Sequence, residues 1–186
     1  YYGSDACINL DNDGDTGGNT RTYFIKISNI SIRNKGTGTT TKGIYVEDSG
    51  VQNFHGSLYF DNISIYSFDH GIYCDYVGWI FITACSVQYC GWGFYGQVNV
   101  LRIEQSAFTA NSRIGFDASA AKEDITARNS GGGVWVHNCT AVTLSSVDME
   151  GQAIGFKSTG TTYANLTGCY FEGHTHMAAF AAGLTT

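Results

Sequence analysis

Two pairs of side chains toward the C-terminal part of the chain could do acid–base chemistry. Asp148 and Glu150 alternate along one short segment, and Tyr170 and Glu172 do the same 22 positions further on. If these segments occupy equal places in a repeat, the Glu150 and Glu172 backbones lie one strand spacing apart, about 4.8 Å. Like charges keep one acid protonated while the other acts as base or nucleophile, as glycosidic cleavage requires. We therefore predict Asp148, Glu150 and Glu172 as catalytic residues; an ordinary solvated acidic surface is the alternative.

A column of aromatic residues could bind sugar rings. Each residue follows a glycine and a large apolar residue, as in Gly71-Ile72-Tyr73. Flat rings pack against the apolar faces of sugars, so these side chains are predicted to bind the substrate together with Tyr170: Tyr45, Tyr73, Tyr95 and Trp135. The same column is expected to include Asp117 and Lys157. A subunit interface, where aromatic residues are also enriched, is the alternative.

Two further carboxylate pairs are second-choice catalytic candidates. Glu47 and Asp75 lie in the column next to the aromatic residues. Asp61 and Glu104 are two turns of the repeat apart, about 9.6 Å between backbones, which suits an inverting glycosidase. Arg102 beside Glu104 could instead form a surface ion pair that contributes little to stability.

The remaining motifs predict neither a metal ion nor a cofactor. The segment Asp11–Asp15 begins like an EF-hand loop, but Thr16 and Thr22 stand where that loop needs glycine and a bidentate glutamate. His174 and His176 alternate on one face without a third ligand at a fixed spacing. Phosphate-binding loops and the zinc-protease motif are absent from the sequence.

A repeat of about 22 residues must position these side chains. Apolar pairs five residues apart recur along the chain, and they begin at Ile27, Phe60, Ile82, Ile103, Leu144 and Leu166. The step of 41 between Ile103 and Leu144 predicts one degenerate turn near Ile125. A second marker, glycine followed by a large apolar residue, keeps the same phase and occurs at Gly43, Gly71, Gly93, Gly115, Gly133 and Gly155.

Alternation within each period indicates strands rather than helices. Leu58 and Phe60 would point inward while Tyr59 and Asp61 point outward, which is the period of two typical of a strand. Three short strands fit each period. Antiparallel hairpins would not return to the same phase every 22 residues, whereas a coil that climbs one level per period would. The sequence therefore predicts an all-β solenoid over residues 21–178, between an irregular segment (1–20) and a tail (179–186).

The repeated Asn-Ile-Ser-Ile segments, at 29–32 and 62–65, and the Gly-Ile-Tyr units resemble the pectin-lyase-like superfamily of right-handed parallel β-helices. Within that superfamily the chain looks most like the tailspike proteins of tailed bacteriophages, and the resemblance covers about residues 20 to 178. It implies a homotrimer on the virion tail, assembled in the host cytoplasm and acting outside the cell. It also implies that the protein binds, and often cleaves, a bacterial capsular polysaccharide or lipopolysaccharide.

The chemistry of such a protein stays open at this point. An endo-glycosidase is favoured over a polysaccharide lyase, because few arginines lie near the carboxylate columns. A non-catalytic structural or receptor-binding rod is a second alternative, and a bacterial polysaccharide lyase or epimerase of the same fold is a third.

The composition of the chain limits which classes of partner are expected. The formal net charge is -6, from 10 basic and 16 acidic residues, which argues against a nucleic-acid partner. Apolar runs fall short of the roughly 18 residues of a membrane span, so no membrane partner is expected. Several of the six cysteines fall at inward positions and are predicted to be buried free thiols, which favours assembly in a reducing cytoplasm. Asn29 and Asn62 fall at the same turn, where buried amides are expected to bond the backbone of adjacent turns.

Overall fold

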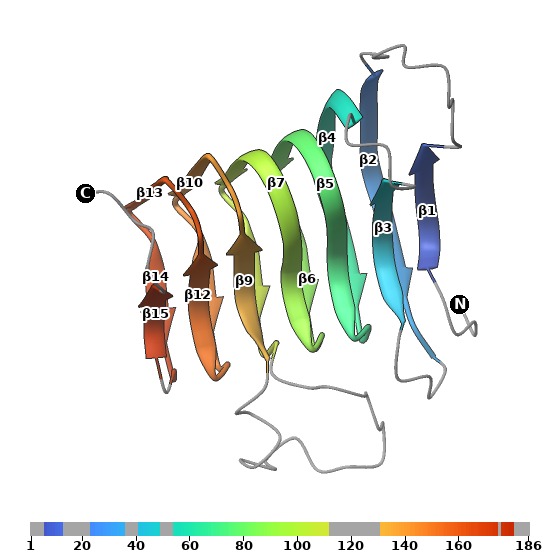
Figure 1. Cartoon of the computed structure of the whole chain (residues 1–186). Helices are drawn as coiled ribbons and strands as arrows, with labels where there is room; N and C mark the ends of the chain where they lie inside the picture. Colours follow the sequence, from blue (N-terminus) through green and yellow to red (C-terminus); the bar gives the residue numbers. More distant parts are fainter. Residues whose placement is uncertain are drawn as a thin grey trace.

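The computed structural model describes residues 6–12, 23–35, 41–48, 54–111, 131–174 and 176–180. These residues form fifteen strands and no helix, so the predicted all-β class is confirmed. The strands belong to one sheet, their pairing is parallel throughout, and they follow one another along the molecule (Figure 1). They are β1 (Ala6–Asn12), β2 (Tyr23–Arg33), β3 (Lys42–Asp48), β4 (Phe54–Tyr66), β5 (His70–Thr83), β6 (Ser86–Gln88), β7 (Trp92–Glu104), β8 (Ala107–Thr109), β9 (Gly132–His137), β10 (Ala141–Ser145), β11 (Asp148–Glu150), β12 (Ile154–Thr159), β13 (Tyr163–Thr167), β14 (Tyr170–Glu172) and β15 (His176–Phe180).

The pairing divides into three ladders that the chain visits in turn. The first ladder runs β2-β4-β5-β7-β10-β13. The second runs β2-β4-β6-β8-β11-β14. The third runs β1-β3-β5-β7-β9-β12-β15, so the long strands belong to two ladders each, and β1 falls within the N-terminal segment that the sequence placed outside the repeat. Because every ladder is parallel, equal positions of the repeat become lateral neighbours.

The predicted interior column is confirmed position by position. Each apolar residue that begins a pair in the sequence repeat is the register partner of the next: Ile27, Phe60, Ile82, Ile103, Leu144 and Leu166. Phe60 is only 1% exposed, and the next three members of the column, Ile82, Ile103 and Leu144, are fully buried. The two outer members, Ile27 and Leu166, are partly buried and pack against this core. The alternation in the sequence therefore fixes a continuous apolar interior.

The predicted additional turn in the long step of the repeat is wrong. An additional turn was expected near Ile125, yet Ile103 pairs directly with Leu144. Phe94 likewise pairs directly with Val134 on the third ladder. The step of 41 therefore holds one turn with extra residues rather than two turns. Residues 112–130, which include Ile125, lie outside the described residues.

The glycine marker has a steric cause. A Cβ atom at Gly71 would lie 2.7 Å from the carbonyl oxygen of Gly93, and one at Gly93 would lie 2.7 Å from that of Gly133. Carbon and oxygen do not approach this closely without contact strain, so only glycine lets neighbouring strands of the third ladder pair at this point. The glycine marker is thus required because the backbones of consecutive turns lie close together at this point.

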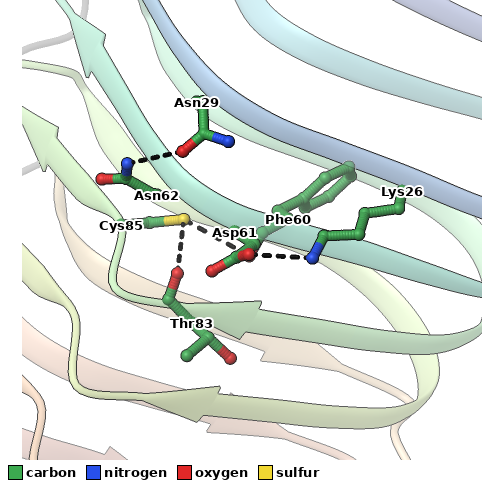
Figure 2. Close-up of polar contacts among 7 residues, drawn as sticks. All are labelled: Lys26, Asn29, Phe60, Asp61, Asn62, Thr83 and Cys85. Atoms are coloured by element: carbon green, nitrogen blue, oxygen red, sulfur yellow. Dashed lines mark hydrogen bonds and ion pairs between the residues drawn. The ribbon is translucent and has the colours of Figure 1, made fainter.

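Asn29 and Asn62 occupy a tight turn between the first and second ladders. Their φ angles are 58° and 53°, in the left-handed region that asparagine tolerates better than most residues. Both side chains are exposed, and the Asn62 amide donates a 2.8 Å hydrogen bond to Asn29 Oδ1 (Figure 2). The expectation of buried amides bonded to backbone is therefore wrong: alternation predicts which strand residues point inward but not the direction of a turn.

All six cysteines are free thiols, as predicted. The Cys85 thiol lies 3.4 Å from the carbonyl oxygen of Phe60 and 3.3 Å from that of Thr83 (Figure 2). Burial raises the pKa of the Cys90 thiol to about 12, which keeps it protonated and unreactive. These cysteines act as small interior hydrophobes.

Candidate functional site

The predicted acidic residues meet at the C-terminal end of the second ladder. Strand β11 pairs with β14 so that Glu150 is opposite Glu172 and Asp148 is opposite Tyr170. The shared column inferred from the sequence is therefore confirmed, with about 4.8 Å between the paired backbones. We call these four residues the acidic patch.

Local structure aims the patch outward. Met149 and Phe171, between the polar members of each strand, face the interior, so their neighbours face away from it. Each strand then ends at a glycine in the left-handed region, Gly151 at φ 66° and Gly173 at φ 68°. These turns keep β11 and β14 only three residues long and bring both glutamates to the ends of their strands.

Exposure and hydrogen bonding differ within the acidic patch. Glu150 and Glu172 are exposed, and Tyr170 is 55% exposed. The Tyr170 hydroxyl donates a hydrogen bond to Glu172 Oε2. This bond to a carboxylate raises the pKa of the Tyr170 phenol, so the tyrosine stays protonated and holds Glu172 as an acceptor. Asp148 is half-buried, and its Oδ1 atom has no hydrogen-bond partner among the described residues.

The aromatic column forms on the third ladder. Tyr45, Tyr73, Tyr95 and Trp135 are consecutive register partners, followed by Lys157. Ring centroids are 5.2 Å apart between Tyr45 and Tyr73, 5.1 Å between Tyr73 and Tyr95, and 4.8 Å between Tyr95 and Trp135. Asp117, which the sequence placed between Tyr95 and Trp135, is outside the described residues, and the direct pairing of those two leaves it no place in the column.

Lysines lie over the rings at both ends of the aromatic column. The Lys42 ammonium is 4.1 Å from the centroid of Tyr45, and the Lys157 ammonium is 3.7 Å from that of Trp135. These are cation–π distances. The column is half-buried, and its rings contact one another and these two cations.

Two histidines accompany the aromatic column, and the sequence reasoning assigned neither of them a role. Burial, reinforced by the positive charge of Lys42, lowers the pKa of His70 to about 4. Burial also lowers the pKa of His137, whose ring centroid is 5.3 Å from that of Tyr95. Both positions belong to regular columns of the repeat, one residue before the glycine marker for His70 and four after it for His137. His137 shares its column with Glu47 and Asp75, but its place in a column does not show that burial holds its ring neutral.

The second-choice carboxylates are engaged elsewhere or only partly described. Asp61 forms a 2.9 Å ion pair with Lys26 (Figure 2), and Glu104 lies 3.8 Å from Arg102. Exposed pairs of this kind contribute about 0–1 kcal/mol. Asp75 falls at a register irregularity in β5, between Cys74 and Val77. The backbone of Glu47 pairs with Asp11 in the third ladder.

A second aromatic group, which the sequence reasoning did not single out, lies on the outer side of the first ladder. The Tyr59 ring stacks on Phe81 at 4.7 Å and contacts Phe24 at 4.8 Å. Phe24 is 71% exposed and the neighbouring Trp79 is 51% exposed. Their outward positions follow from the alternation, but only the register shows that these rings are neighbours.

Within the described ranges, no three His, Cys, Asp or Glu side chains are placed to share a metal ion. No helix in the same ranges has the length and hydropathy needed to cross a bilayer. A scan of protein-family models and searches of curated proteins and of solved structures found no match to this chain.

Proposed function

We propose that the three ladders form a right-handed parallel β-helix of the kind found in phage tailspikes, with three short strands in each coil. Three features support this: all pairing is parallel, the chain returns to each ladder once per turn of the repeat, and one apolar column continues from Ile27 to Leu166. A solenoid of this type presents its outer columns as extended binding surfaces.

We propose further that the protein binds and hydrolyses a bacterial surface polysaccharide. The observation that carries this proposal is the register pairing of Glu150 with Glu172 beside Asp148 and Tyr170. Glu150 donates a proton to the leaving glycosidic oxygen. Glu172, oriented by the Tyr170 hydroxyl, either attacks the anomeric carbon to form a glycosyl-enzyme that water then hydrolyses, or takes a proton from the water that attacks that carbon. The half-buried Asp148 lies beside both glutamates.

The aromatic column would hold the glycan through the exposed parts of Tyr45, Tyr73, Tyr95 and Trp135. It lies on the third ladder while the acidic patch lies on the second, so a chain bound by both must pass around the edge between β11 and β12. A polymer can span both ladders, whereas a single sugar ring cannot. The proposed substrate is therefore a polysaccharide, either capsular or from lipopolysaccharide, and the proposed assembly is a homotrimer on a virion tail.

A non-catalytic rod is the second candidate, and one observation favours it. The rings of the aromatic column contact one another and the ammonium groups of Lys42 and Lys157, so the column can stabilise the fold without any ligand. In that case the same surface would serve attachment or subunit packing.

The test uses a panel of capsular and O-antigen polysaccharides. We expect new reducing ends without the ultraviolet absorbance of unsaturated sugars, and we expect Glu150→Gln and Glu172→Gln each to lower turnover about a hundredfold or more. Gln88→Ala, in the same column of the second ladder but without a titratable group, is the matched control. New ends that carry an unsaturated sugar would mean that the protein is a lyase and not a hydrolase. Binding without cleavage would favour the rod, and wild-type turnover in both glutamate variants would remove the acidic patch from consideration.

A further inference from the structure

His174 links the two turns that carry the paired glutamates. It follows β14, it is half-buried, and its ring centroid lies 5.8 Å from that of Phe171. Its Nδ1 atom is 2.9 Å from the carbonyl oxygen of Gln152, and its Nε2 atom is 2.8 Å from the carbonyl oxygen of Met149. Both ring nitrogens therefore contact backbone acceptors on the turn after β11.

The identity of these partners decides the protonation state that satisfies them. A carbonyl oxygen only accepts hydrogen bonds, so each ring nitrogen must carry a hydrogen, and only the imidazolium form has both. A neutral imidazole would direct one nitrogen lone pair at a carbonyl oxygen. We infer that His174 acts as a protonated clamp and is a positioning residue for Glu150 and Glu172. Its effect on turnover rests on the proposed function; the clamp itself does not.

His174 holds the turn that carries Glu150. Met149 and Gln152 flank Glu150 and Gly151, so His174 fixes both ends of the turn that presents Glu150. The Gly151 amide also donates a 2.8 Å hydrogen bond to the carbonyl oxygen of Glu172. Gly151 has no atom within 4 Å of where a Cβ would stand, so side-chain packing does not hold this turn. Three hydrogen bonds thus hold the turn that follows Glu150 against the end of β14.

The titratable groups nearest the clamp lie on two strands. The two strands that meet at His174 are β11 and β14, and the titratable groups that they carry are Asp148, Glu150, Tyr170 and Glu172. Three of these are carboxylates, and the described residues of these two strands include no cation. The side chain of His176, on β15, lies outside the described part of the chain.

Loss of one proton would break one of the two histidine bonds and loosen the turn. Depolymerisation would then fall on the alkaline side because Glu150 loses its position relative to Glu172, with no change in the glutamates themselves. The acidic patch therefore cleaves polysaccharide only while His174 is protonated.

Nitrogen-15 NMR of the imidazole rings tests the clamp without any substrate. We expect both nitrogens of His174 to be protonated at about pH 6, whereas His137, whose pKa burial lowers, should show one protonated nitrogen. His174→Gln and His137→Gln assign the two signals. A neutral His174 ring at about pH 6 would overturn the proposal.

Amide hydrogen exchange supplies the second readout. Hydrogen bonds from a charged donor are stronger than those between neutral groups, so exchange at Gly151 should quicken about tenfold or more in His174→Gln. His174→Arg, which retains a permanent positive charge with several N–H groups, should restore protection and extend it to higher pH. Unchanged Gly151 exchange in His174→Gln would contradict the clamp. If no polysaccharide is cleaved, the proposed function fails while these two measurements still decide the clamp.

Discussion

The middle of the sheet and its C-terminal end are built from the same repeat but differ in what surrounds each residue. Ile82, in the middle, has a strand on both sides and is fully buried. Leu166, in the same interior column, has β10 on one side only and remains partly exposed. The sequence pattern is equal at the two places, so the difference comes from position along the ladders. The well-packed middle supplies stability, and the end leaves Glu150 and Glu172 accessible.

Two histidines show the same contrast in their surroundings. In the middle, the His70 ring contacts the rings of Tyr73 and Tyr95 at 5.2 Å and 5.1 Å, and burial favours its neutral form. At the C-terminal end, His174 contacts two carbonyl oxygens that require donors. Acidification should therefore destabilise the middle, where His70 is held neutral.

The largest expected effect tests the difference in packing. Phe60→Ala should lower the free energy of unfolding by about 3–5 kcal/mol, because the fully enclosed site cannot collapse around the cavity. Leu166→Ala should cost only about 1–2 kcal/mol, since this side chain is partly solvated already. Urea unfolding of both variants measures the two values. Equal losses would mean that the end of the first ladder is as tightly packed as its middle.

The next effect is a loss of stability in acid that belongs to His70. Its pKa in the folded protein is about 4, below the value of about 6.5 in an unfolded chain, so unfolding takes up a proton between these pH values. Its contribution is present above pH 6.5 and is lost as the pH falls toward 4, on the order of 3 kcal/mol at most. His70→Phe keeps the ring contacts and removes the titration. The measurement is the free energy of unfolding of both proteins at several pH values. If the difference between wild type and variant stays constant from about pH 7 to about pH 4, the prediction is wrong.

The smallest effect concerns the turn between the first two ladders. Ala84 has a φ of 53°, an unfavourable value for alanine, and it occupies the turn next to Asn62. Ala84→Asn should stabilise the protein by about 0.5–1 kcal/mol, because asparagine tolerates this conformation and its amide can extend the pair of Asn29 and Asn62. Ala141→Asn, in an ordinary strand position of β10, is the control. A gain at Ala141 as large as that at Ala84 would refute the turn explanation.

Sequence reasoning reached the all-β class, the interior column and the pairing of Glu150 with Glu172 because these depend on two regular periods. One is the alternation within a strand and the other is the step of about 22 residues between turns. It failed near Ile125, since a period alone cannot separate an extra turn from an insertion. It noted His174 only as a weak candidate metal ligand, because no sequence pattern reveals that two backbone carbonyl oxygens will face its ring.

The direct pairing across the long step has a consequence for how this protein can vary. Phe94 pairs with Val134 and Ile103 pairs with Leu144, although the intervening segment is nearly twice the usual step of about 22 residues. The longer segment between Asn111 and Gly131 thus leaves the register of the following strands unchanged. We expect the same of new sequence inserted there, such as a recognition loop or an affinity tag.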